Sequence, residues 1–365
     1  MILLVSYDKL IEEDSKETGA EGMQHGGIPE KNAKTRDGDA DFLRCIASFF
    51  VVMIHAASAN TTAAIVFDAF ARFSVPVFVL ISGYYLLPRG DSPRRCFRRA
   101  GRLFGLMLAW SFLTYLYELS AGLRAFRIRE LACYLFTEPV HLWYLCAAAA
   151  LAFFTPALSV FFRAASRSEY RYALGLTFLL GSPVLILVRS GWAPTLAVFL
   201  ERTKLPYLLG FLFLYLAGGY FARFGLPERQ NRFAVYVAGL LGVGMTVSCT
   251  LLLSSDGEKN ELLLSFFAPG VIVAGLAVFL LVKAGYTARY PTNASCPALR
   301  VLSDCTLGIY VLHPIMLDLF DRVTGLAPDS PYALLTVPLR TMVAFLLSFV
   351  IVFFLRRVPV FRRMV

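Results

Sequence analysis

Long apolar stretches recur along this chain, separated by short polar connections. A bilayer core of about 30 Å needs roughly 20 apolar residues of α-helix, and each stretch approaches that length. They lie at about 42–60, 66–87, 102–120, 141–162, 172–189, 206–223, 233–253, 262–283, 299–320 and 333–355. The pattern therefore predicts an all-α, polytopic integral membrane protein with about ten transmembrane helices.

The composition agrees with a membrane protein. Hydrophobic residues make up 58% of the 365 positions, charged residues make up 16%, and the mean hydropathy is +0.64. Soluble domains are nearer 45–50% apolar and about 25% charged. The seven Cys fit no zinc or redox spacing, so we interpret them as small hydrophobic residues.

The first 40 residues differ from the rest. They are polar and rich in Gly, with nine acidic residues against five basic ones, and they lack the apolar run of a signal peptide. We interpret residues 1–40 as a disordered tail or the product of a mistaken start codon, and 41–365 as one membrane domain. His25 lies in this tail and is given no role.

Basic residues at the ends of the stretches indicate how the helices are oriented. With the N-terminus inside, the cytoplasmic flanks hold 25 Lys and Arg, the outer connections hold nine, and Arg72 lies within a helix. The positive-inside rule then places both termini in the cytoplasm. The net charge of +10 thus has a membrane explanation and does not indicate nucleic-acid binding.

Arg44 and His55 share the first apolar stretch and are eleven residues apart. Eleven residues turn a helix about 20° past three full turns, so both side chains lie on one face, about 16 Å apart along the axis. Charges at membrane depth are costly and are functional candidates. The alternative is an Arg that reaches the headgroups and a His that a neighbouring helix satisfies.

Two further histidines are predicted at the depth of His55. His313 lies about thirteen residues beyond the cytoplasmic flank, and His141 enters the membrane from outside. Three histidines are also ligands for metal or haem, but no accompanying carboxylate pattern is present, so we expect no metal site. Depth alone does not establish that the three helices bring these rings together.

Arginines cluster between the second and third stretches. Anchoring at the cytoplasmic surface accounts for them, and so does a binding site for an anion with several phosphates. Arg72, within the second stretch, is a further cationic candidate. The cluster comprises Arg94, Arg95, Arg98, Arg99 and Arg102.

Other motifs admit a simpler interpretation beside the functional one. Trp143 and Tyr144 follow His141 and are typical of an aromatic belt at the membrane interface. Ser82-Gly83 is typical of close packing between helices. Tyr310 precedes His313 in the motif Gly-Ile-Tyr-Val-Leu-His-Pro.

These motifs together resemble the acyltransferase-3 family of membrane acyltransferases, and most closely the bacterial subgroup that O-acetylates surface polysaccharides. The resemblance spans about 42–355 and rests on the order of five motifs. Phe78-Val stands where many members have Phe-Phe, and Phe104-Gly105 replaces a frequent Pro. The motifs are Arg44…His55, Arg72…Val75-Pro76-Val77-Phe78…Ser82-Gly83-Tyr84, the arginine cluster, His141-Leu-Trp143-Tyr144-Leu145 and Gly308-Ile-Tyr310…His313-Pro314.

The resemblance implies transfer of an acyl group, typically acetyl, from cytoplasmic acyl-CoA to a hydroxyl of a cell-surface or lipid-linked polysaccharide. It implies a bacterial cytoplasmic membrane, a multi-pass enzyme and no tightly bound cofactor. The partners would be acyl-CoA, the glycan or lipid-linked acceptor, and the lipid bilayer. His55 would act as general base or carry the acyl group, together with Arg44.

The remaining site residues divide between donor and acceptor. Arg72 and the arginine cluster are expected to bind the donor. The acceptor side is expected to comprise His141, Trp143, Tyr144, Ser82, Tyr310 and His313.

Two alternatives compete with an enzyme. A transporter or flippase for a glycan or small anion would also place Arg and His within the membrane. The absence of visible repeat symmetry argues only weakly against it. A membrane receptor without chemistry leaves the intramembrane Arg and His unexplained, so it ranks last.

Overall fold

The computed structural model describes residues 37–359, apart from 138–140, 192–193, 255–257 and 331. All regular elements in these ranges are helices, and one isolated bridge joins Asp37 to Ala294. The larger part of the predicted tail, 1–36, lies outside the described residues. The helices are α3 (Gly38–Ala56), α4 (Thr62–Ala71), α5 (Ser74–Leu86), α6 (Pro93–Ser120), α7 (Ile128–Thr137), α8 (Trp143–Ala164), α9 (Arg167–Gly181), α10 (Pro183–Arg189), α11 (Pro194–Thr203), α12 (Leu205–Phe224), α13 (Arg229–Leu253), η1 (Leu262–Leu264), α14 (Pro269–Arg289), α15 (Pro297–Thr324) and α16 (Ala333–Leu355).

Nine helical segments within the described ranges are long and apolar enough to cross a membrane. Each coincides with one of the predicted stretches. The segment Thr62–Leu86 contains both α4 and α5, which meet at a turn at Arg72 and Phe73. The segment Arg167–Arg189 contains α9 and α10, which meet at Ser182.

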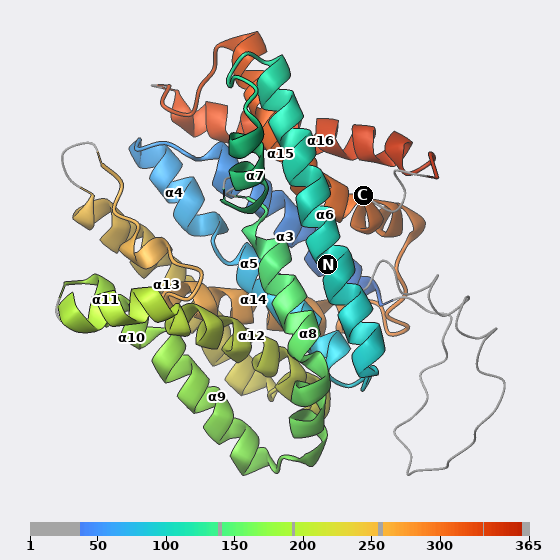
Figure 1. Ribbon diagram of the computed structural model, residues 1–365. Helices are drawn as coiled ribbons and strands as arrows, with labels where there is room; N and C mark the ends of the chain where they lie inside the picture. Colours follow the sequence, from blue (N-terminus) through green and yellow to red (C-terminus); the bar gives the residue numbers. More distant parts are fainter. Residues whose placement is uncertain (1–36, 138–140, 192–193, 255–257, 331, 360–365) are drawn as a thin grey trace.

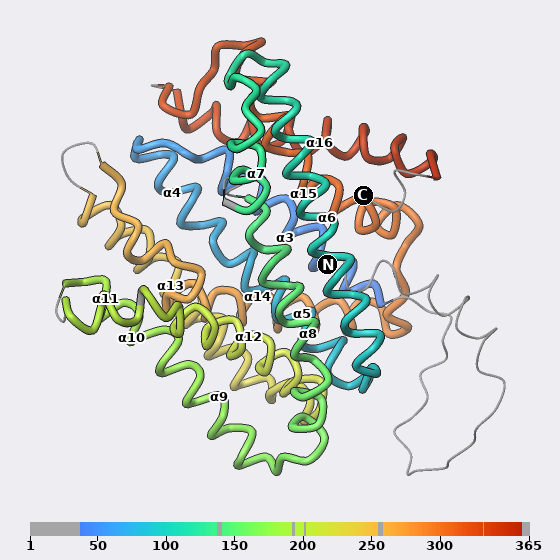
Figure 2. Tube along the Cα trace, viewed as in Figure 1, coloured from blue at the N-terminus to red at the C-terminus, as the bar shows by residue number. Residues whose placement is uncertain are grey.

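The tenth predicted helix is α3, and it differs from the other nine. It is 19 residues long, but its first two turns carry Asp39, Asp41 and Arg44. It lies at the centre of the bundle and packs against α4, α5, α14, α15 and α16 (Figures 1 and 2). Its charges are therefore shielded by protein rather than by lipid, and the predicted all-α, polytopic fold is confirmed.

The folded part begins slightly before the predicted boundary. α3 starts at Gly38, whose N–H donates to the Asn293 carbonyl at 2.7 Å, and Asp39 is buried. Residues 37–40 were predicted to belong to the tail because they are polar. Residues 38–40 belong to the helix, and two partners, Lys283 and Tyr85, satisfy Asp39.

Two short helices lie in connections that were predicted to be outer loops. α7 and α11 have ten residues each, too few to span a bilayer. Hydropathy over a long window does not detect such helices. They lengthen the connections between α6 and α8 and between α10 and α12 (Figure 1).

The helices pack closely where small residues meet backbone. A Cβ on Gly83 of α5 would lie 1.8 Å from the Tyr215 carbonyl oxygen of α12, and a Cβ on Gly218 would lie 2.1 Å from the Leu80 carbonyl oxygen. Both glycines thus allow α5 and α12 to approach backbone to backbone. The prediction that Ser82-Gly83 serves close packing between helices is confirmed for Gly83.

This contact predicts the effect of a single methyl group. Gly83→Ala should lower the Tm of the detergent-solubilised protein by several degrees, since the clash is with backbone that cannot rotate away and overpacking costs about 1–3 kcal/mol. Gly105→Ala in α6 is the matched control, because no atom lies within 4 Å of its added Cβ. Equal Tm values for the two variants, measured by fluorescence-detected size exclusion after heating, would contradict the packing account.

Candidate active site

Three histidines from three parts of the chain meet in the bundle. His55 lies in the last turn of α3, His141 precedes α8, and His313 lies in α15. The ring centroids are 4.9 Å apart for His55 and His313, 5.9 Å for His141 and His313, and 6.5 Å for His55 and His141. The sequence predicted a common depth, and the structure adds that the rings converge laterally. We call His55, His141 and His313 the histidine cluster.

The ring nitrogens of the cluster have defined roles. His313 Nδ1 lies 3.2 Å from the Ile309 carbonyl oxygen, which only accepts, so Nδ1 carries the proton and a neutral ring keeps a lone pair on Nε2. The Nε2 atoms of His141 and His313 are buried without a hydrogen-bond partner among the described residues. Other buried polar atoms also lack a partner, such as Ser48 Oγ and Ser111 Oγ, but these two are imidazole nitrogens that face one another across the cluster, which makes them candidates for a chemical role. The cluster thus offers at least one preformed proton acceptor.

Aromatic residues line one side of the cluster. The Tyr310 hydroxyl donates to the His141 carbonyl and fixes the turn before α8. Tyr144 packs 6.2 Å from Tyr310 and 6.1 Å from Phe78, measured between ring centroids. The Ser82 hydroxyl donates to the Phe78 carbonyl at 2.9 Å. Of the predicted acceptor residues, Tyr310, Tyr144 and Ser82 therefore lie together on the side formed by α5, α8 and α15.

Trp143 has a different environment from its neighbours in sequence. It is 37% exposed, and its ring packs on Phe211 and Phe266 at centroid distances of 5.9 and 5.5 Å. This environment fits the interfacial-belt interpretation. His141, two residues earlier, is 8% exposed and faces the other histidines.

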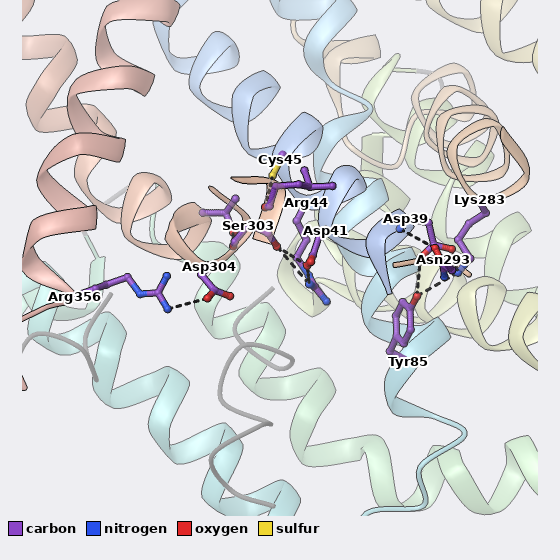
Figure 3. A network of polar contacts seen from close by, with 12 residues as sticks. Asp39, Asp41, Arg44, Cys45, Tyr85, Lys283, Asn293, Ser303, Asp304 and Arg356 are labelled. Atoms are coloured by element: carbon purple, nitrogen blue, oxygen red, sulfur yellow. Dashed lines mark hydrogen bonds and ion pairs between the residues drawn. The ribbon is translucent and has the colours of Figure 1, made fainter. Parts of the chain in front are cut away.

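Arg44 lies on the same face of α3 as His55, as the spacing predicted. Its Nη1 donates to Asp41 Oδ1 at 2.7 Å and to the Ser303 hydroxyl at 3.5 Å, and that hydroxyl donates to Asp41 at 2.8 Å (Figure 3). Ser303 and His313 are both on α15, ten residues apart. α3 and α15 therefore run in parallel, with Arg44 opposite Ser303 and His55 opposite His313, about 15 Å further along.

A second ionic group surrounds the first turn of α3. Lys283 Nζ lies 2.6 Å from Asp39 Oδ2, and the Tyr85 hydroxyl donates to Asp39 Oδ1 at 3.1 Å (Figure 3). Asp39 and Lys283 are 1% and 5% exposed. Sequence reasoning placed Lys283 in the cytoplasmic flank and Asp39 in the tail. It missed the pair because the residues are far apart along the chain.

The arginine cluster divides into two sets at the start of α6. Arg95 and Arg99 hold Asp91 at 3.1 and 2.7 Å, and they are partly buried. Burial alone would raise the pKa of Asp91, but the hydrogen bonds of Arg99 and Arg95 and the charges of Arg99 and Arg89 outweigh it and lower that pKa. Asp91 therefore stays ionised and orients the two arginines. Arg94, Arg98 and Arg102, spaced by four, form an exposed row on one helix face.

Arg72 occupies a different place from the α6 arginines. Its Nε and Nη2 donate to Asp68 Oδ1 and Oδ2 at 2.6 and 2.8 Å, and its guanidinium lies 5.1 Å from the Phe266 ring centroid. Lys259 also binds Asp68, at 2.9 Å. Because Asp68 and Lys259 belong to the outer part of the bundle in the predicted topology, Arg72 is grouped with the outer side.

Comparison with known families adds the class of reaction. The family model for the acyltransferase-3 domain, described as "Acyltransferase domain", matches residues 37–357. The chain belongs to this acyltransferase family. No curated protein and no solved structure matches the chain significantly. Transfer of an acyl group is thus the general activity of this protein.

The part of the acyltransferase that the structure describes contains no recognisable metal site. No group of three or more His, Cys, Asp or Glu side chains in the described ranges has an arrangement suited to a metal ion. The histidine cluster is surrounded by aromatic rings instead.

Sequence reasoning missed one charged residue near the cluster. Arg340 was counted among the outer connections, but it lies inside α16 and is 2% exposed. Removing it from the outer count makes the charge asymmetry across the membrane stronger.

The buried ionic group at the start of α3 predicts a double-mutant result. Lys283→Met alone should destabilise the protein by about 3–5 kcal/mol, since Asp39 would be left charged in the interior. Adding Asp39→Asn should restore much of the Tm and of the level of folded protein. A double variant as unstable as the sum of the single variants would contradict direct pairing.

Proposed function

We propose that this acyltransferase moves an acyl group, with acetyl as the main case, from cytoplasmic acyl-CoA to a hydroxyl of a cell-surface or lipid-linked polysaccharide. The observation that carries the proposal is the histidine cluster, which lies about 15 Å along α3 and α15 from the Arg44–Ser303 contact. In the predicted topology that contact is on the cytoplasmic side. The enzyme would reside in the cytoplasmic membrane of a bacterium.

The donor is expected to enter from the cytoplasmic side. Coenzyme A carries its phosphates at one end and the thioester at the end of a long, thin arm. The exposed row Arg94, Arg98 and Arg102 suits the phosphates, because guanidinium groups form paired hydrogen bonds with phosphate oxygens. Arg95 and Arg99 are engaged with Asp91 beside this row.

The histidine cluster supplies the proton transfers. In the proposed reaction, an imidazole takes the proton of the acceptor hydroxyl while its oxygen attacks the thioester carbonyl. The new C–O bond forms, the C–S bond breaks, and the proton passes to the departing thiolate of coenzyme A. His55 is the proposed base, and the lone pair on His313 Nε2, with the rings 4.9 Å apart, makes His313 its nearest proton partner.

Arg44 is assigned a supporting role in this scheme. Arg44 is 3% exposed, and its guanidinium is bound to Asp41 and Ser303. It therefore holds α3 against α15 on the side of the histidine cluster that the predicted topology places toward the cytoplasm. The acceptor is expected to approach His141, Tyr144, Tyr310 and Ser82 from the outer side.

Replacing the histidines tests the proposal. His55→Gln and His313→Gln should each lower transfer of label from radiolabelled acetyl-CoA to membrane glycan by about 10²–10⁴-fold, the usual contribution of base catalysis. His25→Gln is the control with the same substitution in the tail and should retain full transfer. Full activity of His55→Gln at a normal protein level would exclude His55 as the base.

The arginine row makes a separate prediction about the donor. Changing Arg94, Arg98 and Arg102 together to Gln should raise the KM for acetyl-CoA at least about tenfold with a smaller change in kcat, since each charge-assisted hydrogen bond contributes about 1.5–3 kcal/mol. It should also reduce the preference for acetyl-CoA over its 3′-dephospho form. The charge-matched control changes Arg171, Arg229 and Arg232. An equal rise in KM for both triple variants would indicate surface charge alone.

A further inference from the structure

Arg340 is a buried cation whose three nitrogens contact two other helices. It lies two turns into α16 and is 2% exposed. Its Nε and Nη2 donate to Asp321 Oδ1 and Oδ2 of α15 at 2.8 and 2.6 Å. Its Nη1 donates to the carbonyl oxygen of Ala56, the last residue of α3.

The Ala56 carbonyl is a site where a helix needs a partner. The last four carbonyls of a helix lack intrahelical donors, and the C-terminal end of the helix dipole is negative. The Ala57 N–H closes the last turn by donating to Met53 at 2.9 Å. The Arg340 guanidinium then satisfies the carbonyl directly after His55, so it acts as a cap supplied by another helix.

The Asp321 contact ties the same guanidinium to the helix of His313. Asp321 lies eight residues beyond His313 on α15, about 12 Å along the axis. The Arg340 side chain thus joins the last turn of α3, the helix of His55, to the last turn of α15, the helix of His313. A small apolar cluster of Ala57, Ala64, Ala333 and Val337 packs the start of α16 against the same turn.

We propose that Arg340 is a positioning residue that holds His55 beside His313. Its planar guanidinium makes a two-point contact with Asp321 and a third contact with Ala56, which a lysine ammonium does not reproduce. The catalytic meaning of this clamp rests on the function proposed above. The clamp itself, meaning the contacts of Arg340 with Ala56 and Asp321, concerns only the position of the end of α3. It can therefore be tested without measuring enzyme activity.

Two variants separate positioning from simple ion pairing. Arg340→Lys keeps a cation beside Asp321 but loses the forked contact, and it is the variant least expected to impair folding. The exchange of Asp321→Arg with Arg340→Asp keeps the ion pair but removes the donor to Ala56. Arg356→Lys is the control, because Arg356 joins α16 to Asp304 of α15 at 3.1 Å, near the other ends of both helices.

The kinetic readout uses acetyl-CoA and membrane glycan. Arg340→Lys and the exchange variant should lower kcat by up to about 10²-fold, as small displacements of catalytic groups do, with the KM for acetyl-CoA within about twofold. The Arg356→Lys control should retain wild-type kcat. Wild-type kcat in the exchange variant would overturn the proposal, since the ion pair alone would then suffice.

Hydrogen–deuterium exchange gives the readout that does not depend on activity. In both variants, peptides covering residues 50–60 should exchange faster, while peptides from α12 and α14 should be unchanged. Unchanged exchange at the end of α3 in both variants would overturn the proposal. If the wild-type protein transfers no acetyl group, the proposed function fails, and this exchange result alone decides whether the clamp exists.

Discussion

The need to pair charges inside the bilayer determines where α3 lies. Asp39, Asp41 and Arg44 occupy its first two turns, and a lipid-exposed helix would leave them without partners. The protein instead surrounds α3 with other helices and supplies Lys283 and Ser303 as partners. Once α3 is central and aligned with α15, His55 at its far end lies beside His313.

The two ends of α3 are thus held by different polar contacts. Near its start, Arg44 and Asp41 meet Ser303 of α15, and at its end Arg340 meets the Ala56 carbonyl. Between them the helix packs through apolar residues. This arrangement fixes the rotation and height of α3 relative to α15, which is what a short distance between two imidazoles requires.

The fold followed closely from the sequence, because apolar length is a local property. The nine apolar spans match predicted stretches, and α3 was recognised despite its charges. The short helices α7 and α11 were not predicted, since ten residues give no transmembrane signal. The common face of Arg44 and His55 followed from helical periodicity, and both residues do face α15.

The site followed less completely, because it depends on contacts between distant segments. The common depth of the three histidines was predicted, but not their lateral approach. Arg72 was assigned with the α6 arginines by charge alone, whereas it pairs with Asp68. Arg340 was missed because topology counting placed it in a connection, and only tertiary structure shows its link to Ala56.

The central claim is that the histidine cluster transfers an acyl group to a glycan on the outer side of the membrane. Mass spectrometry of surface polysaccharide from otherwise identical cells, producing either the wild-type chain or His55→Gln at equal levels, tests it most directly. The account predicts acyl esters on the glycan with the wild-type chain and their loss with the variant. Equal acylation in the two strains, or none in either, would contradict it.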